Sequence, residues 1–376
     1  MVNFIICELN PLHNGHHYLL NAVGEAPVVC VMSGHVTQRG AFACMDKWTR
    51  ARAALSCGAD LVLELPAGAA CGSAMDFARG ALAAANATGL DGRLCFGMEE
   101  DNLEILKELA TFPEDQVQAL TRKALDEGAS PAAAMREAYK TLSPEHWTAL
   151  DLPNNLLAFE YIKANTKFDL FALRRVGAAH DSGRPTGDFA DASYLRRHLA
   201  DYPRFTPSAV HPLYKSAIDE GAVLDPRRFD LMITSALRRK TRDEWLSLYP
   251  DGLGARLAEA FETKSLLTDV YDTAKSKCFT HSMIRRAVLR TYLDLPPFTG
   301  DLPYLRVLGL NDTGAALLRR MDPSVPLLIK PAAVKDLSGT ARRAFDTDAR
   351  VTDAFNFALR SPRAKGMEYR SPVVIK

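Results

Sequence analysis

Three histidines stand close together near the start of the chain, in the stretch NPLHNGHHYLL (10–20). His13 and His16 flank Asn14-Gly15, a pair typical of a tight turn. An apolar run precedes them and a helical pattern follows, so we expect a turn from the first strand into the first helix. The unpaired N–H groups and positive dipole end of that helix suit an anion. Imidazole donors at the same place would stabilise a phosphoryl group under attack, with no covalent intermediate.

Short apolar runs alternate with longer amphipathic segments in the first half of the chain, which is typical of a parallel sheet with crossover helices. The expected strands cover residues 2–9, 27–34, 59–65, 92–98 and 168–177. Ligands of such sheets bind beyond the carboxyl ends of the strands, and Pro11 cannot continue a central strand. The histidine turn therefore falls at the ligand-binding edge. Residues 101–165 have helical patterns almost throughout and predict a helical insertion between the fourth and fifth strands.

After residue 200 the strand signals fade, and segments such as PRRFDLMITSALRRKT have helical period. The stretches LPYLRVLGL and VPLLIKPAAV could supply one or two strands. A boundary is expected near the Pro-containing segment DYPRFTPSAVHP (201–212). We therefore predict an α/β fold with a Rossmann-like parallel-sheet domain in residues 1–200, followed by a mostly α-helical domain in residues 201–376.

The composition is that of a globular protein, with 376 residues, 47% of them hydrophobic and 24% charged. No apolar stretch reaches the roughly 18 residues that cross a bilayer, and the N-terminus lacks the basic start of a signal peptide. The seven cysteines include no C-x-x-C pair and no zinc-ligand spacing. We expect reduced thiols, no metal bound by a protein ligand set, and a cytoplasmic location.

The net charge of +1 hides an asymmetry between the two halves. Residues 1–200 hold 18 Lys and Arg against 24 Asp and Glu, whereas residues 201–376 hold 28 against 21. A basic half is typical of a protein with a polyanionic partner, although a solvated surface would give the same count.

The ordered motifs of the chain resemble those of one family. H-N-G-H after the first strand has the H-x-G-H signature of nucleotidyltransferases that transfer adenylyl groups from ATP. The set ELNPLHNGHHYLL, VMSGHVTQRG, DKWTRARAALSCGADLVLELP, LCFGM, LPNNLLAFEYIKA, RRVGAAHD, IRRAVLR, YLRVLGLNDTG and LLIKP covers nearly the whole chain. It is similar to the tRNA(Met) cytidine acetate ligase family. The resemblance implies an ATP-binding, catalytic nucleotidyltransferase domain in 1–200 and a tRNA-binding domain in 201–376.

The resemblance implies a reaction in two steps. Acetate and ATP give acetyl-adenylate and pyrophosphate, and the acetyl group then passes to the wobble cytidine of elongator tRNA(Met), giving N4-acetylcytidine and AMP. The implied substrates are ATP, acetate and this tRNA, with Mg²⁺ accompanying ATP and with no DNA or membrane partner. The alternatives are an adenylyltransferase or ligase acting on a small molecule, and a binding protein without catalysis. The basic second half disfavours the first alternative, and the intact histidines disfavour the second.

Carried over position by position, the resemblance implies that His13 and His16 are catalytic. The implied ATP-binding stretch comprises Ile6, Cys7, Glu8, Leu9, Asn10, Pro11, Leu12, His13, Asn14, Gly15, His16, His17, Tyr18 and Leu19. Further implied ATP-binding positions are Gly97, Asn154, Asn155, Arg174 and Arg175. Gly97 is expected under the adenosine, where a side chain would obstruct it. Either asparagine could instead cap a helix, and of the two arginines we favour Arg175 as the phosphate ligand.

Four further residues are weaker candidates for phosphate binding. Lys47 and Arg50, spaced i, i+3, are either phosphate ligands or part of a solvated helix face. Ser193 and Arg196 match a segment that cradles the triphosphate in this superfamily. There the usual Ser-Ala-Thr is replaced by Asp191-Ala192-Ser193, which adds a carboxylate.

Two milder departures from the family pattern are Leu9, where an aromatic residue is commoner, and Met98, where a small polar residue is commoner. In the second half, Arg285 and Arg286 of the basic helix HSMIRRAVLR are the candidates for contact with tRNA.

Overall fold

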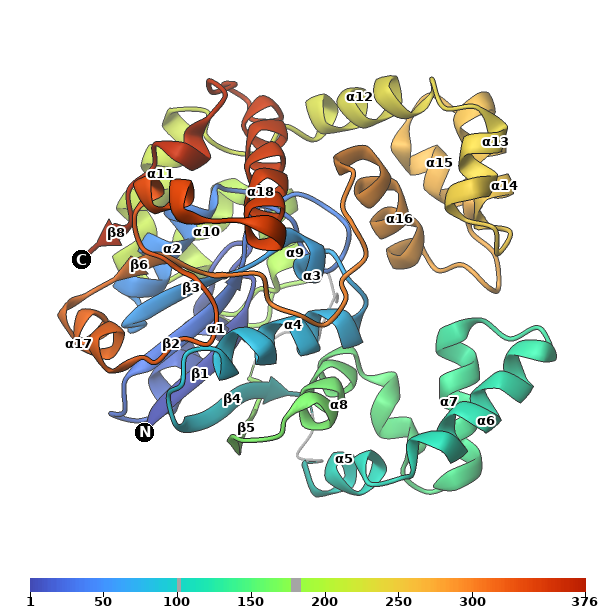
Figure 1. Cartoon of the computed structure of the whole chain (residues 1–376), viewed down its shortest axis with the longest axis horizontal. Helices are drawn as coiled ribbons and strands as arrows, with labels where there is room; N and C mark the ends of the chain where they lie inside the picture. The colour runs from blue at the N-terminus through green and yellow to red at the C-terminus, as the bar shows by residue number, and fades with distance from the viewer. Residues whose placement is uncertain (100–102, 177–183) are drawn as a thin grey trace.

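The computed structural model describes residues 1–99, 103–176 and 184–376 (Figure 1). The last residue of the expected strand 168–177, most of the motif RRVGAAHD (174–181) and the first two residues of the expected insertion 101–165 lie outside the described residues.

A single sheet of eight strands, counted over the described residues, forms the centre of the molecule (Figure 1). The strands are β1 (Val2–Cys7), β2 (Val28–Ser33), β3 (Leu61–Leu65), β4 (Gly92–Met98), β5 (Asp169–Arg174), β6 (Leu305–Leu310), β7 (Leu327–Leu328) and β8 (Val374–Ile375). They are ordered β5-β4-β1-β2-β3-β6-β7, and β8 also pairs with β6. The strands β1 to β5 are parallel to one another, whereas β6 runs antiparallel to β3. The predicted α/β fold with a parallel sheet is confirmed.

Helices cover both faces of the sheet, which explains why the central strands are apolar along their whole length. On one face, α1 (Asn14–Ala22), α2 (Lys47–Ser56) and α11 (His211–Asp219) pack on residues of β1 and β2 in one apolar cluster. The other face contacts α3 (Ala67–Ala70), α4 (Ala74–Asn86) and α8 (Pro153–Ala164) within a second, larger cluster.

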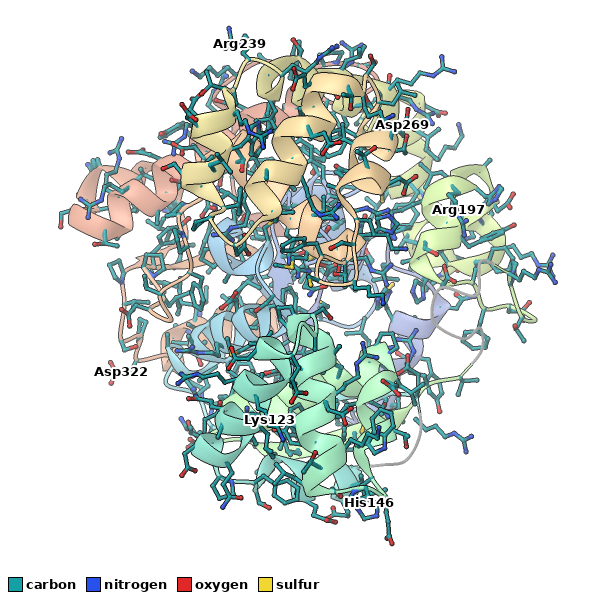
Figure 2. The ribbon with its side chains drawn as sticks, turned by 90° about the vertical axis from the view of Figure 1, so that its right-hand side faces the viewer. Lys123, His146, Arg197, Arg239, Asp269 and Asp322 are labelled. Atoms are coloured by element: carbon teal, nitrogen blue, oxygen red, sulfur yellow. The ribbon has the colours of Figure 1, made fainter. Side chains whose placement is uncertain are left out.

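The predicted insertion between the fourth and fifth strands is helical. Its described elements are α5 (Leu103–Ala110), α6 (Glu114–Asp126), α7 (Pro131–Leu142), the short η1 (Trp147–Asp151) and α8. Figure 2 shows its helices at the bottom of the view, where Lys123 and His146 are labelled.

Beyond β5 the chain is mostly helical. The helices of this part are α9 (Ala192–Arg197), α10 (Tyr202–Phe205), α11, α12 (Pro226–Leu237), α13 (Arg242–Leu248), α14 (Leu253–Thr263), α15 (Leu267–Ala274), α16 (His281–Leu293), α17 (Asp312–Arg320) and α18 (Gly339–Phe357). Single 3-10 turns are η2 (Leu199–Asp201), η3 (Ser208–Val210), η4 (Pro331–Asp336) and η5 (Met367–Tyr369). The helices α12 to α16 form a lobe beside the sheet (Figure 1). This lobe touches the insertion where Cys278 Sγ donates to the carbonyl of Gly128 at 3.7 Å.

The sheet crosses the boundary that the sequence predicts between residues 200 and 201. The two stretches that could supply strands in the second half form β6 and β7, and β6 pairs with β3 of the first half. Without β6, the apolar strand β3 would be an edge strand with unpaired backbone groups, and pairing with β6 removes these groups from solvent. Residues 201–376 therefore comprise a helical lobe and a part of the central sheet. No helix within the described ranges combines the length and the apolarity that a bilayer crossing requires.

Candidate active site

A cleft of about 1570 Å³ opens at the carboxyl ends of the parallel strands. Its walls come from the ends of β1, β4 and β5, the loop after β2, and the starts of α1, α8, α9 and α16. The predicted site residues that line it are Ile6, Cys7, Glu8, Leu9, Asn10, His13, Gly15, His16, Tyr18, Leu19, Gly97, Asn154, Arg175, Ser193, Arg196 and Arg285. The structure thus brings most of the predicted set to one place.

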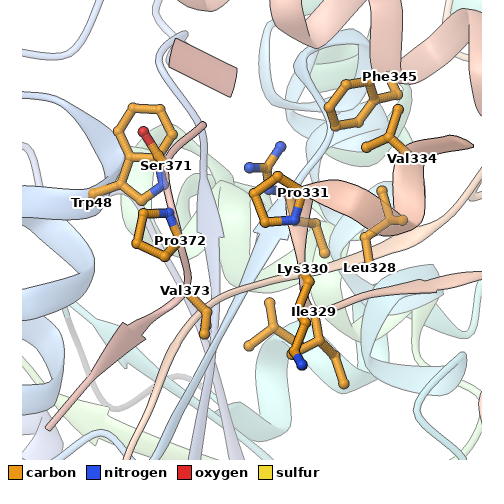
Figure 3. Close-up of a pocket in the computed structure, with 12 residues that line it drawn as sticks. Trp48, Leu328, Ile329, Lys330, Pro331, Val334, Phe345, Ser371, Pro372 and Val373 are labelled. Carbon is orange, nitrogen blue, oxygen red and sulfur yellow. The ribbon is translucent and has the colours of Figure 1, made fainter. Parts of the chain in front are cut away.

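A second cavity lies between Trp48, Phe345 and the prolines Pro331 and Pro372 (Figure 3). Its volume of about 10 Å³ holds at most one water molecule. It cannot accept a substrate, so the large cleft is the candidate active site.

The two motif histidines lie side by side at the start of α1. His13 is the N-cap residue, and its Nδ1 accepts the backbone N–H of Gly15 at 3.1 Å. The Nδ1 of His16 in turn accepts the backbone N–H of His13 at 3.3 Å. The ring centroids are 3.9 Å apart and the ring planes are inclined at 33°. Each imidazole is therefore oriented by a backbone donor, which leaves Nε2 for a ligand.

Both imidazoles are neutral at physiological pH. Burial, reinforced by the neighbouring His16, Arg175 and Arg196, holds the pKa of His13 well below its ordinary value. Burial and Arg175 lower the pKa of His16 to about 3. A neutral ring whose Nδ1 accepts a hydrogen bond carries its proton on Nε2. The pair therefore offers two fixed N–H donors, which suits charge that develops on a phosphoryl group.

The glycine between the histidines is needed for this arrangement. A Cβ at Gly15 would stand 3.0 Å from Cε1 of His13 and 3.1 Å from its Nδ1, which is closer than side chains normally pack. Asn14 donates its side-chain amide to the carbonyl of Asp188 at 2.7 Å, which joins the start of α1 to the loop before α9. Pro11, Leu12, Asn14 and His17, all within the predicted ATP-binding stretch, do not line the cleft.

Neither Asn154 nor Asn155 caps α8, because the carboxylate of Glu99 does so. It accepts the backbone N–H groups of Asn154 at 3.0 Å and Asn155 at 3.3 Å. Asn154 also donates its side-chain amide to Glu99 and lines the cleft. Asn155 is fully buried; its Oδ1 accepts the N–H of Glu99, and its Nδ2 has no partner among the described residues. Position in the cleft therefore favours Asn154 as the nucleotide contact.

Arg174 and Arg175 lie on opposite sides of the end of β5. Arg174 is exposed and outside the cleft, whereas Arg175 is half-buried within it. The pKa of the Arg175 guanidinium is lowered by burial, and its charge acts on both histidines. A Cβ at Gly97 would meet Cγ of Arg175 at 3.2 Å. Gly97 therefore makes room for the Arg175 side chain. Its place under the adenosine stays a prediction.

The unusual carboxylate of Asp191 is the N-cap of α9. It accepts the backbone N–H of Tyr194 at 2.6 Å and the hydroxyl of Ser193 at 2.6 Å. Arg196 donates from Nη1 to the carbonyl of Asn10 at 2.8 Å, which ties α9 to the turn that precedes α1. Asp191 thus caps α9 and also lines the cleft.

The prediction that Lys47 and Arg50 bind phosphate is wrong, and so is the alternative of a solvated helix face. Both side chains are fully buried and neither lines the cleft. Lys47 Nζ pairs with Glu64 at 2.6 Å and with Glu368 at 2.7 Å. The physical reason is that this face of α2 packs against the interior, where the charges are met by buried carboxylates.

Arg50 binds backbone carbonyls at the ends of the central strands. Its guanidinium donates to Glu8 at 2.5 Å, to Ser33 at 3.1 Å and to Met45 at 3.2 Å, and also to Gly34. Its donors thus join the ends of β1 and β2 to the start of α2.

Arg285 and Arg286, the two candidates for tRNA contact, differ in their surroundings. Arg285 is exposed, lines the cleft and lies 5.6 Å from the ring centre of Tyr271. Arg286 is half-buried, lies outside the cleft and donates from Nη1 to the carbonyl of Gln38 at 3.3 Å. Position therefore favours Arg285 as a surface contact and makes Arg286 a support for the loop after β2.

Among the charged residues of the cleft, sequence reasoning missed Arg39, Arg197, Arg360 and Asp201. The described lining contains six arginines, which are Arg39, Arg175, Arg196, Arg197, Arg285 and Arg360. Its described carboxylates are three, Glu8, Asp191 and Asp201. Arg39 had a signal in the sequence, because it belongs to the quoted motif VMSGHVTQRG. The surplus of positive charge suits a polyanionic ligand.

Comparisons with known proteins agree with this geometry. The model of the HIGH Nucleotidyl Transferase family matches residues 2–369. The chain is 36% identical to a tRNA(Met) cytidine acetate ligase of Syntrophotalea carbinolica, over 84% of this chain and 80% of that protein. It is 29% identical to one of Clostridium novyi, over 99% of both.

Two solved structures share the fold over the whole chain. The apo form of Thermotoga maritima TmcAL is 25% identical with a TM-score of 0.93, and the comparison covers 100% of this chain and 99% of that one. The form of the same protein bound with alpha-thio ATP aligns at 24% identity with a TM-score of 0.91, with the same coverage.

Proposed function

The chain belongs to the HIGH nucleotidyl transferase family and, within it, to the tRNA(Met) cytidine acetate ligases, and from this premise we propose that it acetylates the wobble cytidine of elongator tRNA(Met) with ATP and acetate. The observation that carries the proposal is the pair of neutral imidazoles at the start of α1, 3.9 Å apart, on the ligand-binding edge of a parallel sheet.

In the first step, a carboxylate oxygen of acetate attacks the α-phosphorus of ATP. The new bond joins acetate to AMP as a mixed anhydride, and the bond from the α-phosphorus to pyrophosphate breaks. The Nε2–H groups of His13 and His16 donate to oxygens that gain charge during this displacement. The half-buried Arg175 adds a fixed positive charge beside them. In this proposal the nucleoside binds beside Asn154 and Gly97, and the triphosphate beside Arg196 and Ser193, all of which line the cleft.

In the second step, the exocyclic amine of the cytidine attacks the acetyl carbonyl, AMP leaves and the amine loses a proton. Acetyl-adenylate makes this step feasible, because AMP is a far better leaving group than oxide or hydroxide. The cleft extends from the histidines to the start of α16, so an unstacked base presented near Arg285 can reach the same site. Proteins usually recognise RNA sequence in such single-stranded loops.

Magnesium accompanies ATP in this proposal. The described residues contain no group of three or more side chains arranged to hold a metal ion. Mg²⁺ is commonly bound by substrate phosphates, water and one or two carboxylates, and Asp191 lines the cleft beside the expected triphosphate. The ion would neutralise charge on the triphosphate. Because ATP and tRNA are its substrates, we expect the enzyme to act in the cytoplasm.

The test is to incubate the protein with ATP, labelled acetate and total tRNA. The expected result is acetyl-AMP, pyrophosphate and label in tRNA(Met) as N4-acetylcytidine, and no label in a tRNA(Met) transcript whose wobble cytidine is replaced by uridine. Label that reaches a soluble metabolite and no RNA would instead identify a ligase for a small molecule. Nucleotide binding with no turnover would identify a binding protein.

A further inference from the structure

The turn Thr37–Ala41 follows β2 and carries Arg39, which has no role in the steps above. The turn is closed by its own hydrogen bonds, because Thr37 N and Thr37 Oγ1 each donate to the carbonyl of Ala41 at 3.0 Å. The N–H of Gly40 donates to the carbonyl of Thr37 at 3.0 Å, and Val36 bridges to Phe42 in antiparallel fashion. Arg39 thus lies at the tip of a well-defined turn.

The rest of the molecule fixes this turn from both sides. The N–H of Gln38 donates to Oε1 of Glu8, at the end of β1, at 2.7 Å. On the other side Arg286 donates to the carbonyl of Gln38, and Gly40 lies so close to α16 that a Cβ would overlap the backbone of Arg286. Gly40 also has a φ of +73°, which favours glycine. The backbone on each side of Arg39 is therefore held in place.

The order of the strands places this turn opposite the nucleoside. The residues assigned to the nucleoside come from β4 and α8, on one side of β1, whereas the turn follows β2 on the other side. In phosphoryl transfer the attacking and leaving oxygens stand roughly in line across the phosphorus. With the pyrophosphate directed toward Arg196 and Ser193, the attacking carboxylate approaches from the part of the cleft that the nucleotide leaves open.

The side chains of that part of the cleft suit a small carboxylate. Arg39 is half-buried and lines the cleft together with the apolar side chains of Leu9, Ala41 and Phe42. Phe42 is almost fully buried and packs edge-on against Phe229, with the two ring centroids 5.3 Å apart. Its ring therefore forms a fixed wall of the cleft. A guanidinium in an apolar setting binds a carboxylate through paired hydrogen bonds. Glu8 lies near, but burial raises the pKa of its carboxyl group, and the positive charges of Arg196, Arg50 and Arg39 all act on it.

We propose that Arg39 binds the carboxylate of acetate, with Ala41 and Phe42 facing its methyl group, so that the turn Thr37–Ala41 is the acyl subsite of the cleft. The inference rests on the proposed function. Arg39 orients one carboxylate oxygen toward the α-phosphorus and stays protonated. The oxygen–phosphorus bond forms, the bond to pyrophosphate breaks, and no proton passes through Arg39.

The experiment measures acetate-dependent exchange of pyrophosphate into ATP with the full-length chain. In Arg39→Met we expect KM for acetate to rise about 10- to 100-fold, the effect of losing a charged hydrogen-bonded contact, while KM for ATP stays within about twofold. Arg39→Lys keeps the charge but loses the paired hydrogen bonds, so its KM for acetate should lie between those of the parent enzyme and of Arg39→Met. The matched control is Arg122→Met on the exposed face of α6, which should leave both constants unchanged.

A second arm supplies synthetic acetyl-AMP and measures transfer to tRNA(Met). Acetyl-AMP has no free acetate carboxylate, so Arg39→Met should transfer as fast as the parent enzyme, which also shows that the variant folds. An unchanged KM for acetate, a rise in KM for ATP alone, or an equal loss in both arms would each overturn the acyl subsite. Failure of the parent enzyme to transfer from acetyl-AMP would instead overturn the proposed function.

Discussion

At the scale of the residue, the function proposed for this chain depends on which ring nitrogen of each histidine is free. The backbone N–H groups of Gly15 and His13 occupy the two Nδ1 atoms and leave Nε2 as the donor. Burial keeps both rings neutral. The histidines are therefore suited to hydrogen bonding with phosphate oxygens. Because both rings are neutral, their burial does not require the desolvation of a charged group.

Loss of one of these donors should slow adenylate formation. In His16→Ala we expect the rate of acetate-dependent pyrophosphate exchange to fall by about 100-fold or more, as when an oxyanion donor is removed. The variant should still bind nucleotide, because the remaining contacts persist. His146→Ala, in the insertion (Figure 2) and outside the residues that line the cleft, is the control and should keep the parent rate. Unchanged pyrophosphate exchange in His16→Ala would refute the assignment.

The same histidine should make stability depend on pH. The pKa of His16 is about 3 in the folded chain and 6.5 ordinarily, so the unfolded chain binds more protons between these values. Stability from this group is therefore present above pH 6.5 and is lost as the pH falls, by about 2 kcal/mol at pH 5. Replacement by Asn removes this dependence. Urea unfolding of the parent and of His16→Asn at pH 7.5 and pH 5 should show a smaller loss in the variant, and parallel losses would contradict the expected shift.

Residue patterns near the histidines could be predicted from the sequence because they are local. The turn, the helix start and the direction of His13 and His16 follow from neighbours within a few positions. The sequence already favoured Arg175 over Arg174, and the structure places Arg175 in the cleft and leaves Arg174 exposed outside it. The contact between Gly97 and Arg175 could not be predicted, because the two residues are remote in sequence.

At the scale of the element, the sequence predicts which residues of α2 share a face but not what that face contacts. The i, i+3 spacing of Lys47 and Arg50 correctly puts them on one face of a helix. Spacing does not say what that face meets. The partners of Lys47 are Glu64 on β3 and Glu368 in η5, and the partners of Arg50 are carbonyls at strand ends. Long-range packing therefore decided the role of both charges.

Arg50 should matter for stability because it satisfies several carbonyls at once. In Arg50→Met, the buried carbonyls of Glu8, Ser33, Gly34 and Met45 lose their guanidinium donor, and we expect a loss of about 3 kcal/mol or more in the free energy of unfolding. Arg50→Lys should recover only a part of the lost free energy of unfolding, since one ammonium group cannot reach all the carbonyls that the guanidinium binds.

The matched control for Arg50 is Arg52→Met on the exposed side of the same helix, which should change stability by about 0.5 kcal/mol or less. Guanidinium chloride unfolding measures all three variants. If Arg50→Met kept the parent stability and instead raised KM for ATP, the sequence-based assignment of Arg50 to phosphate would be restored.

At the scale of the whole molecule, the helical lobe and the sheet meet at the loop after β2. Arg286 of α16 holds Gln38, whereas Arg285 beside it is exposed in the cleft. Two adjacent residues of α16 therefore have different roles, because Arg286 supports the loop after β2 and Arg285 is available to a ligand in the cleft. The sequence predicted the helical character of this half, but it could not predict that β6 joins the first sheet, because strand pairing across more than two hundred residues leaves no local signal.

The two arginines should separate in experiment. In Arg285→Gln we expect weaker binding of tRNA(Met) and a salt dependence reduced by about one ionic contact, with acetyl-AMP synthesis unchanged. In Arg286→Gln we expect slower acetyl-AMP synthesis as well, because the support of the turn Thr37–Ala41 is weakened. Filter binding at several salt concentrations and pyrophosphate exchange measure the two effects. Equal damage to both steps in Arg285→Gln would mean that its role is structural.

Pairing of β6 with β3 makes the two halves of the chain inseparable as polypeptides. A fragment that stopped at residue 200 would lack β6 and would expose the edge of β3, whose five residues are all buried in the full chain. Such an exposed edge pairs readily with another chain and leads to self-association. In such a fragment the buried ammonium group of Lys47 would also lose its ion pair with Glu368. Catalysis by this scaffold cannot be transplanted as a module: any chimera that borrows the nucleotide cleft has to inherit the distant strand that seals it.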